Sequence, residues 1–135
     1  MSLVLDSSVT LAWIYSDETT GEIRRIFDRI LVQGAWVPTL WRLEVANVLE
    51  MGCRRGRYDA NFRDAALADL ALLSIREDGD TGKHAWGAAL RLASHHKLTL
   101  YDAVYLELAH RRSLPLATLD NELRNAALAE NIEVL

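Results

Sequence analysis

The segment Ser2-Leu3-Val4-Leu5-Asp6-Ser7-Ser8 decides which fold class we expect for this chain. Its first four residues form a short, mostly apolar run, which is typical of a strand buried in a sheet. Asp6, Ser7 and Ser8 follow at once, and all three are residue types that favour the N-terminus of a helix. The segment therefore predicts a strand, a turn that carries a carboxylate, and a short helix.

The rest of the chain continues this alternation of extended and helical patterns. Capping residues and apolar residues at helical spacing predict helices at residues 20–34, 39–56, 58–73, 85–96 and 99–109, and a last helix that opens at Asp120. Short apolar runs predict strands at 35–38, 74–76, 114–119 and 132–135. Parallel strands need helical crossovers that cover both faces of their sheet. We therefore expect one α/β domain over residues 1–135, with short strands in a mostly parallel central sheet.

Three aspartates occupy the positions where this fold gathers functional groups. Asp6 and Asp120 each follow directly on a predicted strand, and ligands of parallel sheets lie beyond the carboxyl ends of the strands. Asp102 lies three residues after Thr99, which is expected to cap the helix that begins there. Each aspartate also has a simple local explanation, as a helix cap or as a charge favoured by the helix dipole.

Glu44 is harder to explain locally. It shares a helix face with apolar residues three or four positions away, and a carboxylate on such a face needs a partner. Asn47, three residues further on, is the expected hydrogen-bond donor. The four acids Asp6, Glu44, Asp102 and Asp120 are therefore the candidate catalytic residues.

Like charges gathered at a sheet edge repel one another, and a divalent cation relieves the repulsion. Carboxylate oxygens select Mg²⁺ or Mn²⁺ over zinc, and such a site can hydrolyse phosphodiester bonds without a covalent nucleophile. The four histidines have no evident catalytic role; His95 and His96 close a helix and are expected to cap its carbonyl groups.

Composition limits the partners and the compartment. A net charge of −4 and a pI near 5.5 oppose nucleic-acid binding over the whole surface, so such contacts must be local, at Arg42, residues 54–57 or Arg111-Arg112. No basic leader precedes the first strand, no apolar run reaches membrane-spanning length, and Cys53 has no cysteine partner in the chain. These features predict a cytoplasmic protein.

Taken in order, the acid motifs resemble those of PIN-domain ribonucleases, in particular the VapC toxins of bacterial toxin-antitoxin pairs. The resemblance spans the chain and rests on four segments: Val4-Leu5-Asp6-Ser7-Ser8, Pro38 to Asn47, Leu98 to Tyr105, and Leu116-Ala117-Thr118-Leu119-Asp120. It implies a three-layer α/β/α sandwich, Mg²⁺-dependent endonuclease activity on RNA, a homodimer, and inhibition by an antitoxin protein. It also implies that Asp6 and Asp102 are direct metal ligands, that Asp120 and Glu44 complete the acidic cluster, and that Thr118 and Ser8 orient water or a carboxylate.

Three tryptophans, Trp13, Trp36 and Trp41, flank the acid-bearing segments and are expected either to pack in the core or to line a groove for the antitoxin. Two other functions stay open. A phosphoacceptor signalling domain also gathers acids at strand ends, but it needs a lysine after its last strands, and neither Lys83 nor Lys97 has that position. A catalytically inert PIN-like interaction module is the other alternative.

Overall fold

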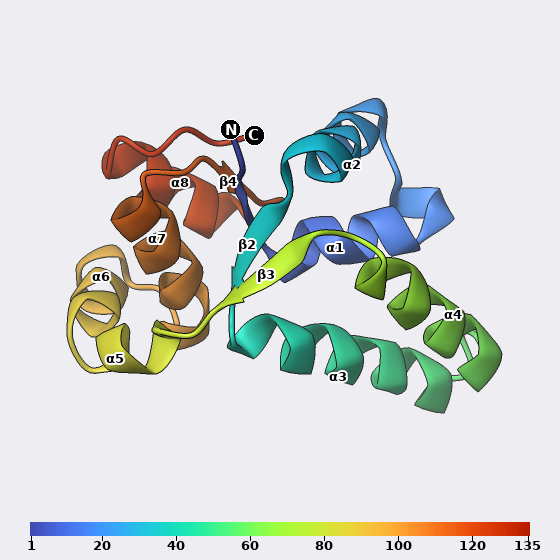
Figure 1. Cartoon of the computed structure of the whole chain (residues 1–135). Helices are drawn as coiled ribbons and strands as arrows, with labels where there is room; N and C mark the ends of the chain where they lie inside the picture. The colour runs from blue at the N-terminus through green and yellow to red at the C-terminus, as the bar shows by residue number, and fades with distance from the viewer.

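The computed structural model describes every residue from Met1 to Leu135 and contains one four-stranded sheet. All strand pairs are parallel and the strand order is β3-β2-β1-β4, so the predicted α/β fold with a short-stranded parallel sheet is confirmed (Figure 1). The strands are β1 (Val4–Leu5), β2 (Ala35–Pro38), β3 (Ile75–Asp78) and β4 (Leu116–Ala117).

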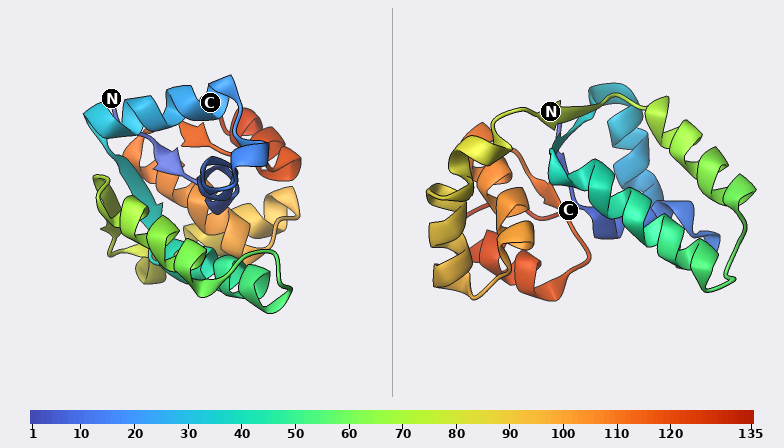
Figure 2. Two further views of the ribbon diagram at one scale, coloured as in Figure 1. Left: turned by 90° about the vertical axis from the view of Figure 1, so that its right-hand side faces the viewer. Right: turned by 90° about the horizontal axis from the view of Figure 1, so that it is seen from below.

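Eight α-helices and one 3₁₀ turn connect and cover the strands. They are α1 (Ser7–Ile14), the 3₁₀ turn η1 (Ser16–Glu18), α2 (Gly21–Gln33), α3 (Leu40–Arg54), α4 (Ala60–Ala71), α5 (Thr81–Ala85), α6 (Ala88–His96), α7 (Leu100–Arg112) and α8 (Asn121–Ala129). Helix α7 contacts β1, β2 and β4 on one side of the sheet, with α5, α6 and α8 beside it. Helices α1, α2 and α3 lie on the other side, so the molecule has three layers (Figures 1 and 2).

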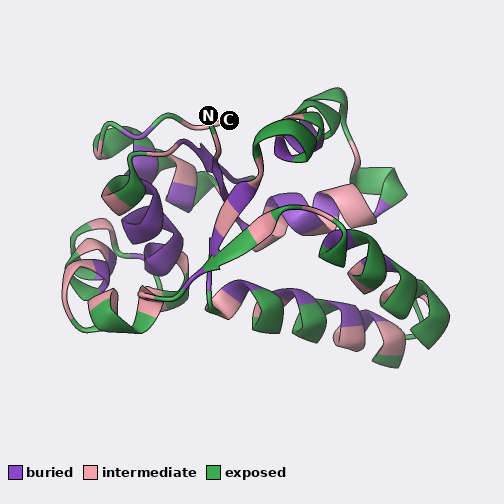
Figure 3. Ribbon diagram, viewed as in Figure 1, coloured by how far each residue is buried: buried purple, intermediate pink, exposed green.

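The core lies around β1, β4 and the middle of α7. Seven consecutive residues of α7, Ala103 to Ala109, are buried, and both residues of β1 and of β4 are fully buried. By contrast, α4 packs mainly against α3 and exposes most of its surface (Figure 3). Because α7 starts at the acid motif and runs through the core, its N-terminus is held firmly at the sheet edge.

Several predicted boundaries differ from the structure. The expected helix at 85–96 is divided into α5 and α6 with Gly87 between them, and the expected strand at 132–135 is reduced to a single bridge between Leu116 and Val134. Thr39 has helical backbone angles and makes no capping hydrogen bond, whereas Thr99 caps α7 as predicted by accepting the Asp102 N–H. None of these differences moves an acid of the candidate site.

A buried ion-pair cluster fastens β3 to the end of α7. The Asp78 side chain is 1% exposed and accepts hydrogen bonds from Arg111 and Arg112, and Arg111 also donates to Glu107. The Arg112 guanidinium lies 3.5 Å from the centre of the Trp36 ring. Arg111 and Arg112 are therefore held in ion pairs within the fold, which argues against this pair among the candidate nucleic-acid contacts.

None of the helices combines the length and the apolar character that crossing a membrane requires.

Candidate active site

Asp6 is the buried centre of the site. It follows β1, and its backbone N–H donates to the Ala117 carbonyl at 3.0 Å, which fixes the end of β1 against β4. The residue is 4% exposed. Although Asp6 occupies the N-cap position of α1, its side chain makes no capping hydrogen bond. The simplest local explanation for this carboxylate therefore fails.

Two hydroxyl groups hold the Asp6 carboxylate instead. Ser8 Oγ and Thr118 Oγ1 both donate to Oδ2 of Asp6 at 2.7 Å. Each hydroxyl in turn accepts a backbone N–H, from Leu119 at 3.0 Å and from Asp120 at 3.1 Å respectively. Because the N–H groups occupy acceptor positions of the hydroxyls, the hydroxyl protons are directed to Asp6. The structure thus places Ser8 and Thr118 where they orient a carboxylate.

Glu44 reaches the site from the first turns of α3. It is half-buried, and its Oε1 accepts a hydrogen bond from the Tyr105 hydroxyl at 2.5 Å. Asn47 is exposed and makes no hydrogen bond to Glu44, so the predicted donor is wrong. The sequence did not point to Tyr105, because its role depends on a contact between α3 and α7; Tyr105 and Glu44 are 61 positions apart in the chain. Its position three residues after Asp102, on the same face of α7, was the available signal.

Asp102 and Asp120 approach from two helix N-termini. Asp102 lies in the first turn of α7 and is half-buried. Asp120 is the N-cap of α8, where its Oδ1 accepts the Leu123 N–H at 2.9 Å. One oxygen of Asp120 thus stabilises a helix, and the other is free to take part in the site.

Three of the four acids have a raised pKa, in part because of the negative charge of another member of the group. Burial raises the pKa of Asp6, and the negative charge of Asp120 raises it further, against the lowering effect of the Thr118 and Ser8 hydrogen bonds. Burial also raises the pKa of Glu44, with contributions from Asp6 and Asp102. The pKa of Asp102 is raised by burial and then by Asp120 and Asp6.

No lysine, arginine or histidine neutralises this cluster. The ion pairs of the chain involve other carboxylates, and none includes Asp6, Glu44, Asp102 or Asp120. Four unpaired carboxylates in a half-buried site favour a divalent cation. No three of them have oxygen atoms that all lie within 4.8 Å of one another, so they do not form a closed coordination shell by themselves. This arrangement fits Mg²⁺, which keeps several waters and takes one or two carboxylates.

The three tryptophans have separate environments. Trp13 stacks on Phe27 with ring centres 4.5 Å apart, and Trp36 packs under Arg112. Trp41 is buried and donates from Nε1 to Thr10. The three do not line a common groove, so that prediction is wrong.

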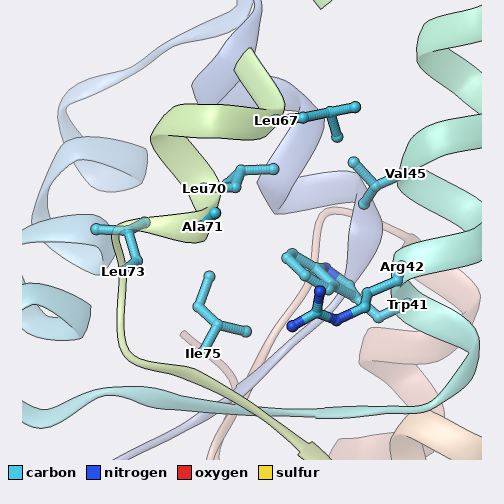
Figure 4. Close-up of a pocket in the computed structure, with 8 residues that line it drawn as sticks. All are labelled: Trp41, Arg42, Val45, Leu67, Leu70, Ala71, Leu73 and Ile75. Carbon is cyan, nitrogen blue, oxygen red and sulfur yellow. The ribbon is translucent and has the colours of Figure 1, made fainter. Parts of the chain in front are cut away.

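An apolar groove does border Trp41. It has a volume of about 270 Å³ and lies between α3, α4 and the start of β3 (Figure 4). Its lining residues are Trp41, Arg42, Val45, Leu67, Leu70, Ala71, Leu73 and Ile75. No carboxylate of the acid cluster lines it, so the groove and the acid site are different surfaces.

Comparison with known proteins identifies the family. A model of the PIN domain matches residues 3–128, and the chain therefore belongs to the PIN-domain family. It is 30% identical over 127 residues to the protein named Ribonuclease VapC3 from Pyrobaculum aerophilum. The matched region covers 91% of this chain and 92% of that protein. The crystal structure of PAE2754 from Pyrobaculum aerophilum is similar in fold, with a TM-score of 0.65, 24% identity, and coverage of 93% of this chain and 79% of that chain. The VapC-type PIN domain that the sequence motifs predicted is confirmed.

Proposed function

We propose that this chain is a Mg²⁺-dependent endoribonuclease, with Mn²⁺ as an accepted substitute, and that it is the toxin of a toxin-antitoxin pair. The observation that carries the proposal is the gathering of Asp6, Glu44, Asp102 and Asp120, without a basic partner, at one edge of a parallel sheet. Membership of the PIN family and similarity to Ribonuclease VapC3 support nuclease chemistry.

In this mechanism Asp6 and Asp102 would hold the cation, and Asp120 would complete the cluster. A bound Mg²⁺ supplies Lewis acidity and stabilises the negative charge that develops on a phosphodiester. Ser8 and Thr118 fix the orientation of Asp6 through their hydrogen bonds. Glu44, held by Tyr105, or Asp120 would assist removal of a proton from the attacking water.

The proposal is tested by cleavage of labelled RNA with purified protein in Mg²⁺, and again with a chelator. Asp6→Asn keeps the shape of the side chain and removes its charge, so we expect a loss of about 10²-fold or more in the rate. Asp28→Asn, an exposed aspartate on α2, is the matched control and should cleave like the wild type. Equal rates for Asp6→Asn and wild type, or cleavage that persists after chelation, would contradict the proposal.

The same assay separates the alternative functions. An inert interaction module would leave RNA intact in both Mg²⁺ and Mn²⁺. A phosphoacceptor domain would take up phosphate on an aspartate from a small phosphodonor. The second alternative lacks its lysine, because Lys83 pairs with Asp80 at 3.2 Å and Lys97 ends α6.

The proposed partners are an RNA substrate, an antitoxin protein and a second copy of the chain, in the cytoplasm. We place the antitoxin in the apolar groove of Figure 4, where the apolar face of a helix would contact Trp41, Leu67 and Leu70. Leu67→Glu should then abolish binding of the antitoxin and leave RNA cleavage unchanged, as measured by co-purification and by the cleavage assay. Undiminished co-purification of Leu67→Glu would exclude this groove.

A further inference from the structure

His95, His96 and Glu130 form a compact cluster that the proposed nuclease does not use. Their ligand atoms all lie within 4.8 Å of one another, and no other three His, Cys, Asp or Glu side chains of the chain meet this limit. His96 Nε2 and Glu130 Oε1 are 2.7 Å apart, and the two imidazole rings lie at 85° with centres separated by 4.6 Å. Three ligands of two types, imidazole and carboxylate, therefore converge from two separate segments.

The cluster is distinct from the acid site. Helix α8 begins after Asp120, at the acid site, and ends just before Glu130. At 1.5 Å per residue, the ten steps from Asp120 to Glu130 span about 15 Å along the helix. The cluster thus lies at the far end of α8, where α6 also ends.

The histidines do not have the role that the sequence suggested. Helix α6 ends with Lys97 in a left-handed conformation, and the Lys97 N–H bonds the Ala93 carbonyl. His96 instead turns to Glu130, with only 11% of its side chain exposed. This hydrogen bond alone would be enough to join the two helix ends, but it does not explain why the exposed His95 has its ring directed to the same point.

We propose that His95, His96 and Glu130 bind a borderline divalent ion such as Zn²⁺. Imidazole and carboxylate ligands in a group of three are typical of zinc sites that keep a further position for water, whereas Mg²⁺ prefers oxygen ligands throughout. A cavity of about 450 Å³ borders Glu130, and its lining includes His110 and Glu133 but neither His95 nor His96. The bound ion connects the end of α6 to the residue that follows α8.

Co²⁺ absorption and Zn²⁺ calorimetry on the full chain at neutral pH test this site. Co²⁺ with nitrogen ligands in a four-coordinate site absorbs strongly in the visible range, and Co²⁺ held by oxygens in the acid site does not. We expect such a spectrum at one equivalent in the wild type. His95→Ala and Glu130→Gln should weaken Zn²⁺ binding by about 10- to 100-fold or more.

His84→Ala and Glu22→Gln are the matched controls, a histidine and an exposed glutamate on α2 that both lie outside the cluster, and both should bind Zn²⁺ like the wild type. His95 is exposed, so its replacement leaves the fold intact, which circular dichroism verifies. A wild type without the visible spectrum would overturn the proposal. So would unchanged Zn²⁺ affinity in both His95→Ala and Glu130→Gln.

Discussion

The buried carboxylate of Asp78 allows a quantitative prediction about stability and pH. Burial alone would raise its pKa, but hydrogen bonds from Arg111, Arg112 and the Asp80 N–H hold the pKa at about 2, below the ordinary 3.8. One pKa unit corresponds to about 1.4 kcal/mol, so ionised Asp78 contributes about 2 kcal/mol to folding. Because the folded-state pKa is the lower one, this contribution is present above pH 4 and is lost as the pH falls towards 2.

Asp78→Asn removes the titrating charge, and urea unfolding between pH 6 and pH 2 measures how much this charge contributes to the free energy of unfolding. At pH 6 the variant should be less stable than the wild type by about 3–5 kcal/mol, because two arginines lose a buried partner. The difference should shrink by about 2 kcal/mol as the pH falls to 2. Carboxylates that share no arginine with Asp78 contribute equally in both proteins, so their effects cancel in the difference.

Asp80→Asn is the control for Asp78→Asn. Asp80 pairs with Lys83 at the surface, where its side chain is 51% exposed, so its loss should cost no more than about 1 kcal/mol. A stability difference between wild type and Asp78→Asn that stays constant with pH would show that the Asp78 charge is not what holds β3 to α7. A cost for Asp80→Asn as large as that for Asp78→Asn would show the same.

Two further predictions concern the acid site. Thr118→Val keeps the shape of the side chain and removes the hydroxyl that donates to Asp6. A hydrogen bond to a charged group contributes about 1.5–3 kcal/mol, so we expect the Mg²⁺ concentration needed for half-maximal cleavage to rise about tenfold or more. An unchanged Mg²⁺ concentration would contradict the role of this bond. Tyr105→Phe frees Glu44 and should lower the cleavage rate by a similar factor, whereas Tyr15→Phe, which removes a hydroxyl from a tyrosine pair outside the site, should leave the rate unchanged. A loss of rate in both tyrosine variants would point to a general effect on the fold.

Much of the framework was predictable because the signals are local. The strand at β1, the capping of α7 by Thr99 and the end of α2 at Gly34 each follow from a few adjacent residues, and the structure has all three. Gly34 adopts a φ of 73°, a value that glycine reaches without strain. Side-chain contacts between elements that are distant in the sequence were not predictable in this way. The Tyr105 bond to Glu44 and the pairing of Arg111 with Asp78 depend on which helix packs on which strand.

Asp6 and Asp120 show how far a local pattern can be taken. Both follow a parallel strand and precede a helix, and helix capping explains either one equally well from the sequence. In the structure Asp120 caps its helix, but Asp6 does not; Asp6 is buried and accepts hydrogen bonds from two hydroxyl groups. A buried carboxylate that leaves its helix uncapped and sits among like charges reduces the stability of the fold. The cation that we propose for this site would offset that cost, because it would lie between Asp6 and Asp102 and balance their charges.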